Sequence, residues 1–141
     1  MRVQTILPVP SPSMLTMDCR QSLETVASLV RLYHPFKWTL ETLSSRLTFV
    51  ISEDEQIKAA VWTHPLARDG FSVPDVWEVH FVSAPEVRGR WLAPVVPYML
   101  RTGIALGVRT LLAVISDPKI ARITERLGFK RIGPFAILRL K

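Results

Sequence analysis

Apolar residues follow a helical period in the first part of the chain. Between residues 18 and 33 they recur at steps of three and four, at Leu23, Val26, Ala27, Val30 and Tyr33. This spacing places them on one face and predicts an amphipathic helix. The pair His34-Pro35 ends it, because a residue before proline disfavours the helical conformation. Residues 39–46 predict a second, short helix.

The next segments have the shorter period of strands. Residues 47–52 and 57–63 each predict a strand, and the charged run Glu53-Asp54-Glu55 between them predicts a hairpin turn. Residues 64–74 contain proline, glycine and charges, so we expect a loop there. Residues 76–83 are rich in valine and aromatic residues, which favour a strand.

The last third alternates helix and strand. A helix with apolar positions 95, 96, 99, 100 and 106 is expected to close near Gly107, and residues 110–115 predict a buried strand. Asp117-Pro118 predicts the next helix start, with Asp as the cap and Pro in the first turn. Gly128 is the expected left-handed stop. Residues 129–132 and 135–140 predict strands around a turn at Gly133-Pro134.

This order of elements predicts an α/β (α+β) fold with a mixed, mostly antiparallel central sheet and helices on both faces. At 141 residues the chain is most simply one domain. Residues 1–17 stand apart, because Pro8, Pro10 and Pro12 at alternate positions favour an extended arm that lies on the domain or on a partner. We therefore divide the chain into an arm, 1–17, and a domain, 18–141.

Charge is distributed unevenly along the chain. Residues 1–87 carry seven basic and ten acidic side chains, so their net charge is −3. Residues 88–141 carry eleven basic and two acidic side chains, so their net charge is +9. Such a basic half indicates a polyanion, a phosphate-bearing cofactor or an acidic protein surface as partner, or simply a solvated face. Nucleic-acid binding stays possible, although no nucleic-acid-binding motif supports it.

Other chemistry is limited by composition. No apolar run is long enough for a membrane span. Cys19 is the only cysteine, so no internal disulfide forms, and a cytoplasmic location fits. With one cysteine and three scattered histidines, we expect no metal site. His34 and His64 each precede a proline in an expected turn, and neither is a favoured candidate.

Two segments carry a family resemblance. The first follows the strand at 76–83 and reads V-S-A-P-E-V-R-G-R-W-L-A, from Val82 to Ala93. The second, at the end of the last helix, reads E-R-L-G-F, from Glu125 to Phe129. Together, in this order and with a strand between them, they resemble the GNAT superfamily of N-acetyltransferases. The likeness covers roughly residues 18–140.

The resemblance implies an acetyl-CoA-dependent transfer of an acetyl group to an amine by direct attack. In the family, backbone amides of the first motif bind the cofactor's pyrophosphate, as exposed amides at a helix start attract phosphate in general. The corresponding residues here are Val82, Arg88, Gly89, Arg90, Trp91, Leu92 and Ala93.

Three residues are candidates for proton transfer. Glu78 and His80 lie on the strand that would line the substrate cleft, and either could act as the base; they could equally face solvent or satisfy each other. Thr124 stands where many family members have a tyrosine that acts as general acid. A threonine hydroxyl is a poor proton donor to a thiolate.

Departures from the motif support an alternative. Trp91 replaces a loop glycine, and its bulk competes with diphosphate for space; Pro94 and Pro97 lack amides. A helix that starts or bends near Pro94 would displace the amide site. The alternative is a non-catalytic component that contacts protein partners through residues 1–17 and the basic surface. Some tailed-phage virion proteins resemble acetyltransferases with eroded motifs in this way, so a virion is the alternative location.

Overall fold

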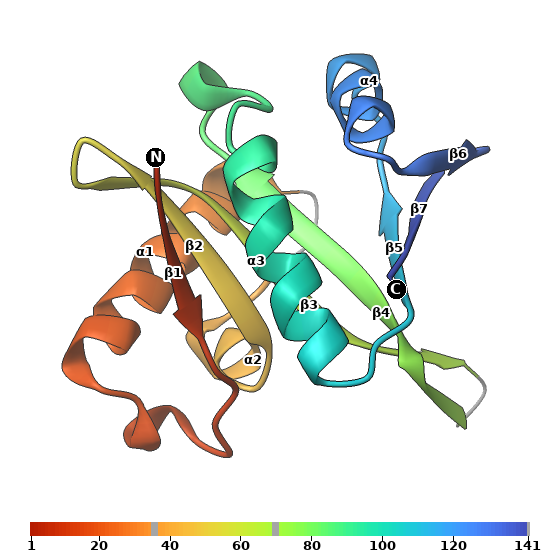
Figure 1. The fold of residues 1–141 in the computed structure, drawn as a ribbon. Helices are drawn as coiled ribbons and strands as arrows, with labels where there is room; N and C mark the ends of the chain where they lie inside the picture. Colours follow the sequence, from red (N-terminus) through yellow and green to blue (C-terminus); the bar gives the residue numbers. More distant parts are fainter. Residues whose placement is uncertain (35–36, 69–70, 141) are drawn as a thin grey trace.

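A computed structural model describes residues 1–34, 37–68 and 71–140, which form a seven-stranded sheet with helices on both faces (Figure 1). The strands are β1 (Arg2–Ile6), β2 (Leu47–Glu53), β3 (Gln56–Arg68), β4 (Phe71–Ser83), β5 (Thr110–Val114), β6 (Lys130–Ile132) and β7 (Phe135–Arg139). The α-helices are α1 (Met17–Tyr33), α2 (Leu40–Ser44), α3 (Leu92–Ala105) and α4 (Pro118–Arg126), and the 3-10 turns are η1 (Pro12–Met14) and η2 (Pro85–Val87).

The sheet is mostly antiparallel, as predicted. Its strand order is β1-β2-β3-β4-β5-β7-β6, and the pairing of β4 with β5 is the parallel one. That parallel ladder is short: it runs from Val76 opposite Thr110 to Val79 opposite Ala113. Beyond Val79, β4 continues to Ser83 without a partner in β5, so the two strands separate at their carboxyl ends.

Each face of the sheet buries its own apolar core. On one face, β-strand residues such as Phe49, Val61 and Val79 pack with α3 and α4. On the other face, Val50, Trp62 and further residues pack with α1. Because strand side chains alternate between faces, odd and even positions of β2 and β3 divide between the two cores. Most of the favourable free energy of folding is expected from this burial.

Local signals set the helix ends where the sequence predicts them. Thr16 caps α1 by accepting a hydrogen bond from the Cys19 amide, and Asp117 caps α4 by accepting one from the Lys119 amide at 2.9 Å. Thr39 and Thr42 form a reciprocal capping box at α2. Gly128, with φ of +100°, follows α4 in the left-handed conformation.

The first 17 residues belong partly to the sheet. Arg2–Ile6 is extended, as expected, and pairs with β2 as strand β1. Further along, the Val9 amide donates to the Ser44 carbonyl at 2.9 Å. Residues 2–6 of the expected arm thus form the edge strand of the sheet, and α1 begins at Met17.

The expected loop at 64–74 was wrong. Apart from 69–70, which lie outside the described residues, this stretch extends β3 and β4 into a long hairpin. The register shifts between Pro65 and Leu66, so that Pro74 and the two residues after it have no partner in β3. Prolines are tolerated at such an irregularity because no ladder hydrogen bond is required there.

The helix α3 begins two residues before Pro94, close to the start that the sequence suggests. The helix begins at Leu92, which puts Pro94 at its third position, where an N–H has no helical acceptor. Pro97 then lies inside the helix, without the N–H that would bond to the Ala93 carbonyl.

Candidate functional site

A cavity opens where β4 and β5 separate. Its volume is about 460 Å³. It is lined by Glu78 to Ser83 of β4, by Val114 at the end of β5, by Ser116, Asp117 and Ile120 after that strand, and by Tyr33 and His34 at the end of α1. A volume of this size is typical of small-molecule pockets. Two of the predicted proton-transfer residues, Glu78 and His80, therefore do line a cavity.

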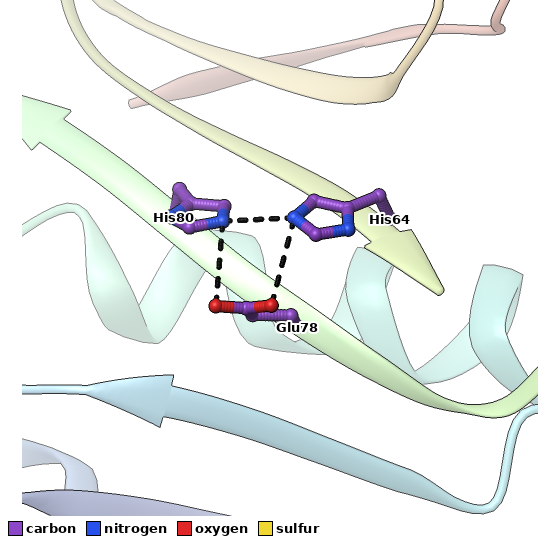
Figure 2. A group of neighbouring side chains, drawn as sticks. All are labelled: His64, Glu78 and His80. Carbon is purple, nitrogen blue, oxygen red and sulfur yellow. Dashed lines mark hydrogen bonds and ion pairs between the residues drawn. The ribbon is translucent and has the colours of Figure 1, made fainter. Parts of the chain in front are cut away.

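His64 joins these two residues (Figure 2). It lies directly opposite Glu78 in the β3–β4 ladder, and His80 is two residues further along β4 on the same face. The Nε2 atoms of His64 and His80 are 3.0 Å apart. One Glu78 carboxylate oxygen lies 3.7 Å from His64 Nε2, and the other lies 3.8 Å from His80 Nε2.

The three side chains are partly shielded from water. Their exposed fractions are 20% for His64, 23% for His80 and 32% for Glu78. The Trp38 ring packs on His80 with centroids 5.1 Å apart, and the two imidazoles stack at the same centroid distance. Burial lowers the pKa of His80 to about 4; Glu78 opposes this shift, whereas His64, His34 and Arg46 add to it. His80 is thus neutral at neutral pH.

Sequence reasoning missed His64 because it assigned this residue to a turn. The signal was available: if the strand at 57–63 is extended by one residue, His64 falls opposite the strand that carries Glu78 and His80. Proline at 65 suggested a break, but the strand continues past it.

The predicted phosphate loop uses several of its own amides. Those of Val87, Arg88, Arg90 and Leu92 donate to carbonyls of the same loop, at 3.2, 3.4, 2.8 and 3.2 Å. In the described chain, no backbone carbonyl accepts from the amides of Gly89, Trp91 and Ala93. Three amides of the predicted set therefore have no backbone acceptor, but Gly89 and Trp91 are buried and Ala93 is the exposed one.

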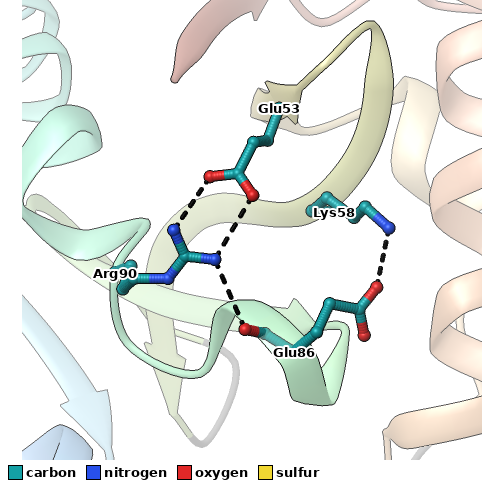
Figure 3. Close-up of polar contacts among 4 residues, drawn as sticks. All are labelled: Glu53, Lys58, Glu86 and Arg90. Atoms are coloured by element: carbon teal, nitrogen blue, oxygen red, sulfur yellow. Dashed lines mark hydrogen bonds and ion pairs between the residues drawn. The ribbon is translucent and has the colours of Figure 1, made fainter.

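Both loop arginines are held by carboxylates. Arg88 makes two hydrogen bonds to Asp117, at 3.0 and 2.8 Å. Arg90 makes two to Glu53, at 3.0 and 3.2 Å, and a third to the Glu86 carbonyl (Figure 3). The guanidinium groups that were candidates for a phosphate thus tie the loop to α4 and to the β2–β3 hairpin.

The indole of Trp91 lies in the core between the sheet and α3. Its side chain is 1% exposed, and its ring centroid is 5.3 Å from that of Phe81. Trp91 and Phe81 border a residual space of about 30 Å³, together with Val79, Ala113, Ile120 and other apolar side chains. In the described chain the indole N–H has no acceptor.

Thr124 borders the same residual space. It is 2% exposed, and its hydroxyl donates to the Ala121 carbonyl at 2.7 Å. The proton is therefore already engaged within α4. Of the remaining predicted residues, Val82 and Leu92 are buried in opposite cores, and Ala93 is exposed at the start of α3.

The loop also approaches α4 closely. A Cβ added to Gly89, whose φ is +80°, would lie 2.6 Å from Ile123 Cδ1. Glycine is therefore favoured at position 89 by its left-handed conformation, and a larger residue there would also displace the end of the Ile123 side chain. Together with the Arg88–Asp117 pair, this contact joins the β4–α3 loop to α4.

This arrangement of strands, with the β4–β5 separation and the helix after β4, is the GNAT fold of N-acetyltransferases. A ribosomal-protein-alanine N-acetyltransferase from Brucella melitensis matches with a TM-score of 0.72 and 12% identity, over 99% of this chain and all of that one. The phosphinothricin acetyltransferase of Sinorhizobium meliloti, a structure in complex with acetyl-CoA, matches with a TM-score of 0.70 and 16% identity, over 99% and 89%.

The ribosomal-protein-S18-alanine N-acetyltransferase from Escherichia coli matches with a TM-score of 0.66 and 16% identity, over 99% of this chain and 95% of that one. No protein-family model and no curated protein sequence matches the chain.

Within the described residues, none of the helices combines the length and hydropathy that a membrane crossing requires. The structural likeness at these identities establishes the fold.

Proposed function

We propose that this chain is a non-catalytic member of the GNAT fold, which binds a protein partner and closes the space between the sheet and α3 with its own residues. The observation that carries the proposal is the placement of Trp91. Its indole lies beside Phe81 of β4 and Ala113 of β5, on the side of the sheet that α3 covers.

The remaining space decides whether a cofactor chain fits. About 30 Å³ is left among Trp91, Phe81 and their neighbours, which is room for about one or two water molecules. A pantetheine chain is many times larger. The residues that line this space therefore leave no room for a pantetheine chain between the sheet and α3.

The loop contacts support the same conclusion. Arg88 and Gly89 bring the β4–α3 loop against Asp117 and Ile123, so a ligand that runs from the loop amides toward the strands has to separate these contacts. Two hydrogen bonds and an apolar contact oppose this. An exposed ion pair alone is a weak barrier, of about 0–1 kcal/mol, so the indole is the stronger obstacle.

The partner-binding part of the proposal rests on the surface. The first 17 residues expose the apolar side chains of Met1, Leu7, Met14 and Met17. The second half of the chain is strongly basic, and Lys119, Arg122 and Arg126 lie exposed on α4. The two features lie at opposite ends of the sheet, so each is a separate candidate contact: the apolar segment for an apolar patch of a partner, and the basic surface for an acidic one. By resemblance, a tailed-phage virion is one such assembly.

N-acetyl transfer is the second candidate, and one observation favours it. The cavity of about 460 Å³ at the β4–β5 separation is lined by Glu78 and His80, and three loop amides have no backbone acceptor. A neutral His80 offers a basic nitrogen beside Glu78, but its pKa of about 4 makes it a weak base for an amine.

Titration with acetyl-CoA separates the two candidates. We expect the full chain to give no heat and no rise in melting temperature at ~1 mM acetyl-CoA, a concentration that detects a Kd in the millimolar range. Saturable binding by the wild-type chain, or acetylation of a model amine, would overturn the proposal in favour of the second candidate.

Two variants make the test specific to the indole. Trp91→Gly is expected to gain measurable affinity for acetyl-CoA, because it empties the space beside Phe81. Trp77→Ala, which removes another buried tryptophan in the same core, is expected to gain none. Each loses about 3–5 kcal/mol of stability, so binding is measured below the lower melting temperature.

Partner binding has a separate test. Light scattering after size exclusion, with limited proteolysis of the full chain, reports on residues 7–16. Self-association, or cleavage there in a monomer, is expected for a segment that awaits a partner. A monomer in which this segment resists protease would count against the interaction role.

A further inference from the structure

The cluster of His64, Glu78 and His80 can be described as a set of metal ligands. Two imidazole nitrogens and a carboxylate come from adjacent strands, and one ligand atom of each lies within 4.8 Å of the others. Strands fix these positions: His64 and Glu78 are cross-strand neighbours, and Glu78 and His80 share one face of β4. A site built on paired strands is more rigid than one built on loops.

The hydrogen bond from His64 Nδ1 to the Pro65 carbonyl leaves the lone pair of Nε2 directed toward His80. Its Nδ1 lies 3.0 Å from the Pro65 carbonyl oxygen, which can only accept, so Nδ1 carries the proton. In the neutral ring, Nε2 is then a bare acceptor that points at His80. Metal-binding histidines generally donate their other N–H to such a carbonyl, which fixes the tautomer.

We propose that His64 Nε2, His80 Nε2 and the Glu78 carboxylate together bind one divalent transition-metal ion, with Zn²⁺ as the best-suited probe. Without the ion, the His80 Nε2–H donates to His64 Nε2 across the 3.0 Å gap. With it, the ion replaces this proton, and His80 carries its proton on Nδ1. The inference does not depend on whether acetyl-CoA binds.

The distances are close to those that zinc requires. Ligands at 2.0–2.1 Å in a tetrahedral site are separated by ~3.4 Å. The nitrogens are 3.0 Å apart, and the nitrogen–oxygen distances are 3.7 and 3.8 Å. The two nitrogen–oxygen distances reach different Glu78 oxygens, whereas with one oxygen as the ligand the three atoms lie within 4.8 Å of one another. The carboxylate therefore has to rotate toward one ring, or bind the ion through both oxygens.

The ligand types and the surroundings also fit a transition metal. Two imidazoles with one carboxylate suit Zn²⁺, and non-haem iron uses the same set, whereas Ca²⁺ and Mg²⁺ prefer oxygen ligands. Trp62 and Trp38 pack against His80 and hold its ring in place. Because Glu78 and His80 line the large cavity, one coordination position is directed toward a space that water or a small ligand can enter.

Calorimetry of the full chain with ZnCl₂ tests the site. We expect one ion per chain, no comparable heat with Mg²⁺, and visible d–d absorption when Co²⁺ is used. Each of the variants His64→Gln, His80→Gln and Glu78→Gln should weaken zinc binding by at least about tenfold. The control is His34→Gln, which should change it less than any of the three.

A measurement on the wild-type chain covers the case of a variant that does not fold. In histidine ring spectra, Zn²⁺ should shift the resonances of His64 and His80 and leave those of His34 little changed. Absence of saturable binding up to ~1 mM Zn²⁺ would overturn the proposal. So would equal weakening by His34→Gln, because it would place the ion outside the cluster.

Discussion

Arg88 and Asp117 join two elements that are 29 residues apart in the chain, through two hydrogen bonds of 3.0 and 2.8 Å. Asp117 also caps α4 by accepting from the Lys119 amide. One carboxylate therefore fixes both the start of α4 and the position of the β4–α3 loop. In this protein, the loop that resembles a phosphate-binding site is held by the protein's own acids.

The stability that the Arg88–Asp117 pair contributes should decrease in acid. The bonds from Arg88, and then the Lys119 amide, hold the pKa of Asp117 at about 2, below its usual 3.8. A lowered folded-state pKa stabilises the protein above the unfolded-state pKa, and this contribution is lost as pH falls from about 4 to about 2. We expect urea midpoints of the wild-type chain to fall across that window.

The variant Asp117→Asn isolates the charge. Asparagine is a good helix cap, so α4 is retained, while the ion pair and its titration are removed. The fall in midpoint between pH 4 and 2 should be shallower in this variant than in Glu125→Gln, which removes an exposed carboxylate from the same helix. An equal slope in both variants would contradict the assignment.

Gly89 should be less replaceable than Gly107. Both have φ near +80°, but an added Cβ at Gly89 would lie 2.6 Å from Ile123 Cδ1, whereas nothing lies within 4 Å at Gly107. We expect Gly107→Ala to cost about 1 kcal/mol in the free energy of unfolding, from the backbone alone. Gly89→Ala should cost slightly more, about 2 kcal/mol, because the flexible end of the Ile123 side chain also has to move.

Ile123→Val supplies the control for this contact, because it deletes the obstructing methyl group. In that background, the extra cost of Gly89→Ala over Gly107→Ala should shrink, as measured by chemical denaturation. If the difference persists, the contact between the loop and α4 is not its cause.

Replacing Pro97 should stabilise α3. Pro97→Ala restores an N–H that can donate to the Ala93 carbonyl, which stabilises the helix by about 3 kcal/mol. The unfolded chain also becomes more flexible, and this lowers the free energy of unfolding by about 1 kcal/mol. We expect a net gain of roughly 2 kcal/mol. Pro94→Ala, at the third helical position, should give no such gain, because its N–H has no helical acceptor. Equal effects at both sites would contradict the helix start at Leu92.

The sequence by itself determined most of the elements, since their signals are local. The apolar spacing of residues 18–33, the cap at Asp117 and the left-handed stop at Gly128 each depend on neighbours within a few residues. The mixed, mostly antiparallel sheet follows from the order of these elements, and the two motifs indicated the GNAT fold that the structural comparisons show.

Tertiary structure alone decided which chemistry the fold presents. The partners of Arg88 and Arg90 lie 29 and 37 residues away in sequence, and His64 meets His80 across a strand pairing that extends past Pro65. No local pattern specifies whether the Trp91 indole turns outward toward a ligand or inward toward Phe81. That choice depends on the apolar surface available between the sheet and α3, which exists only once distant segments have packed together.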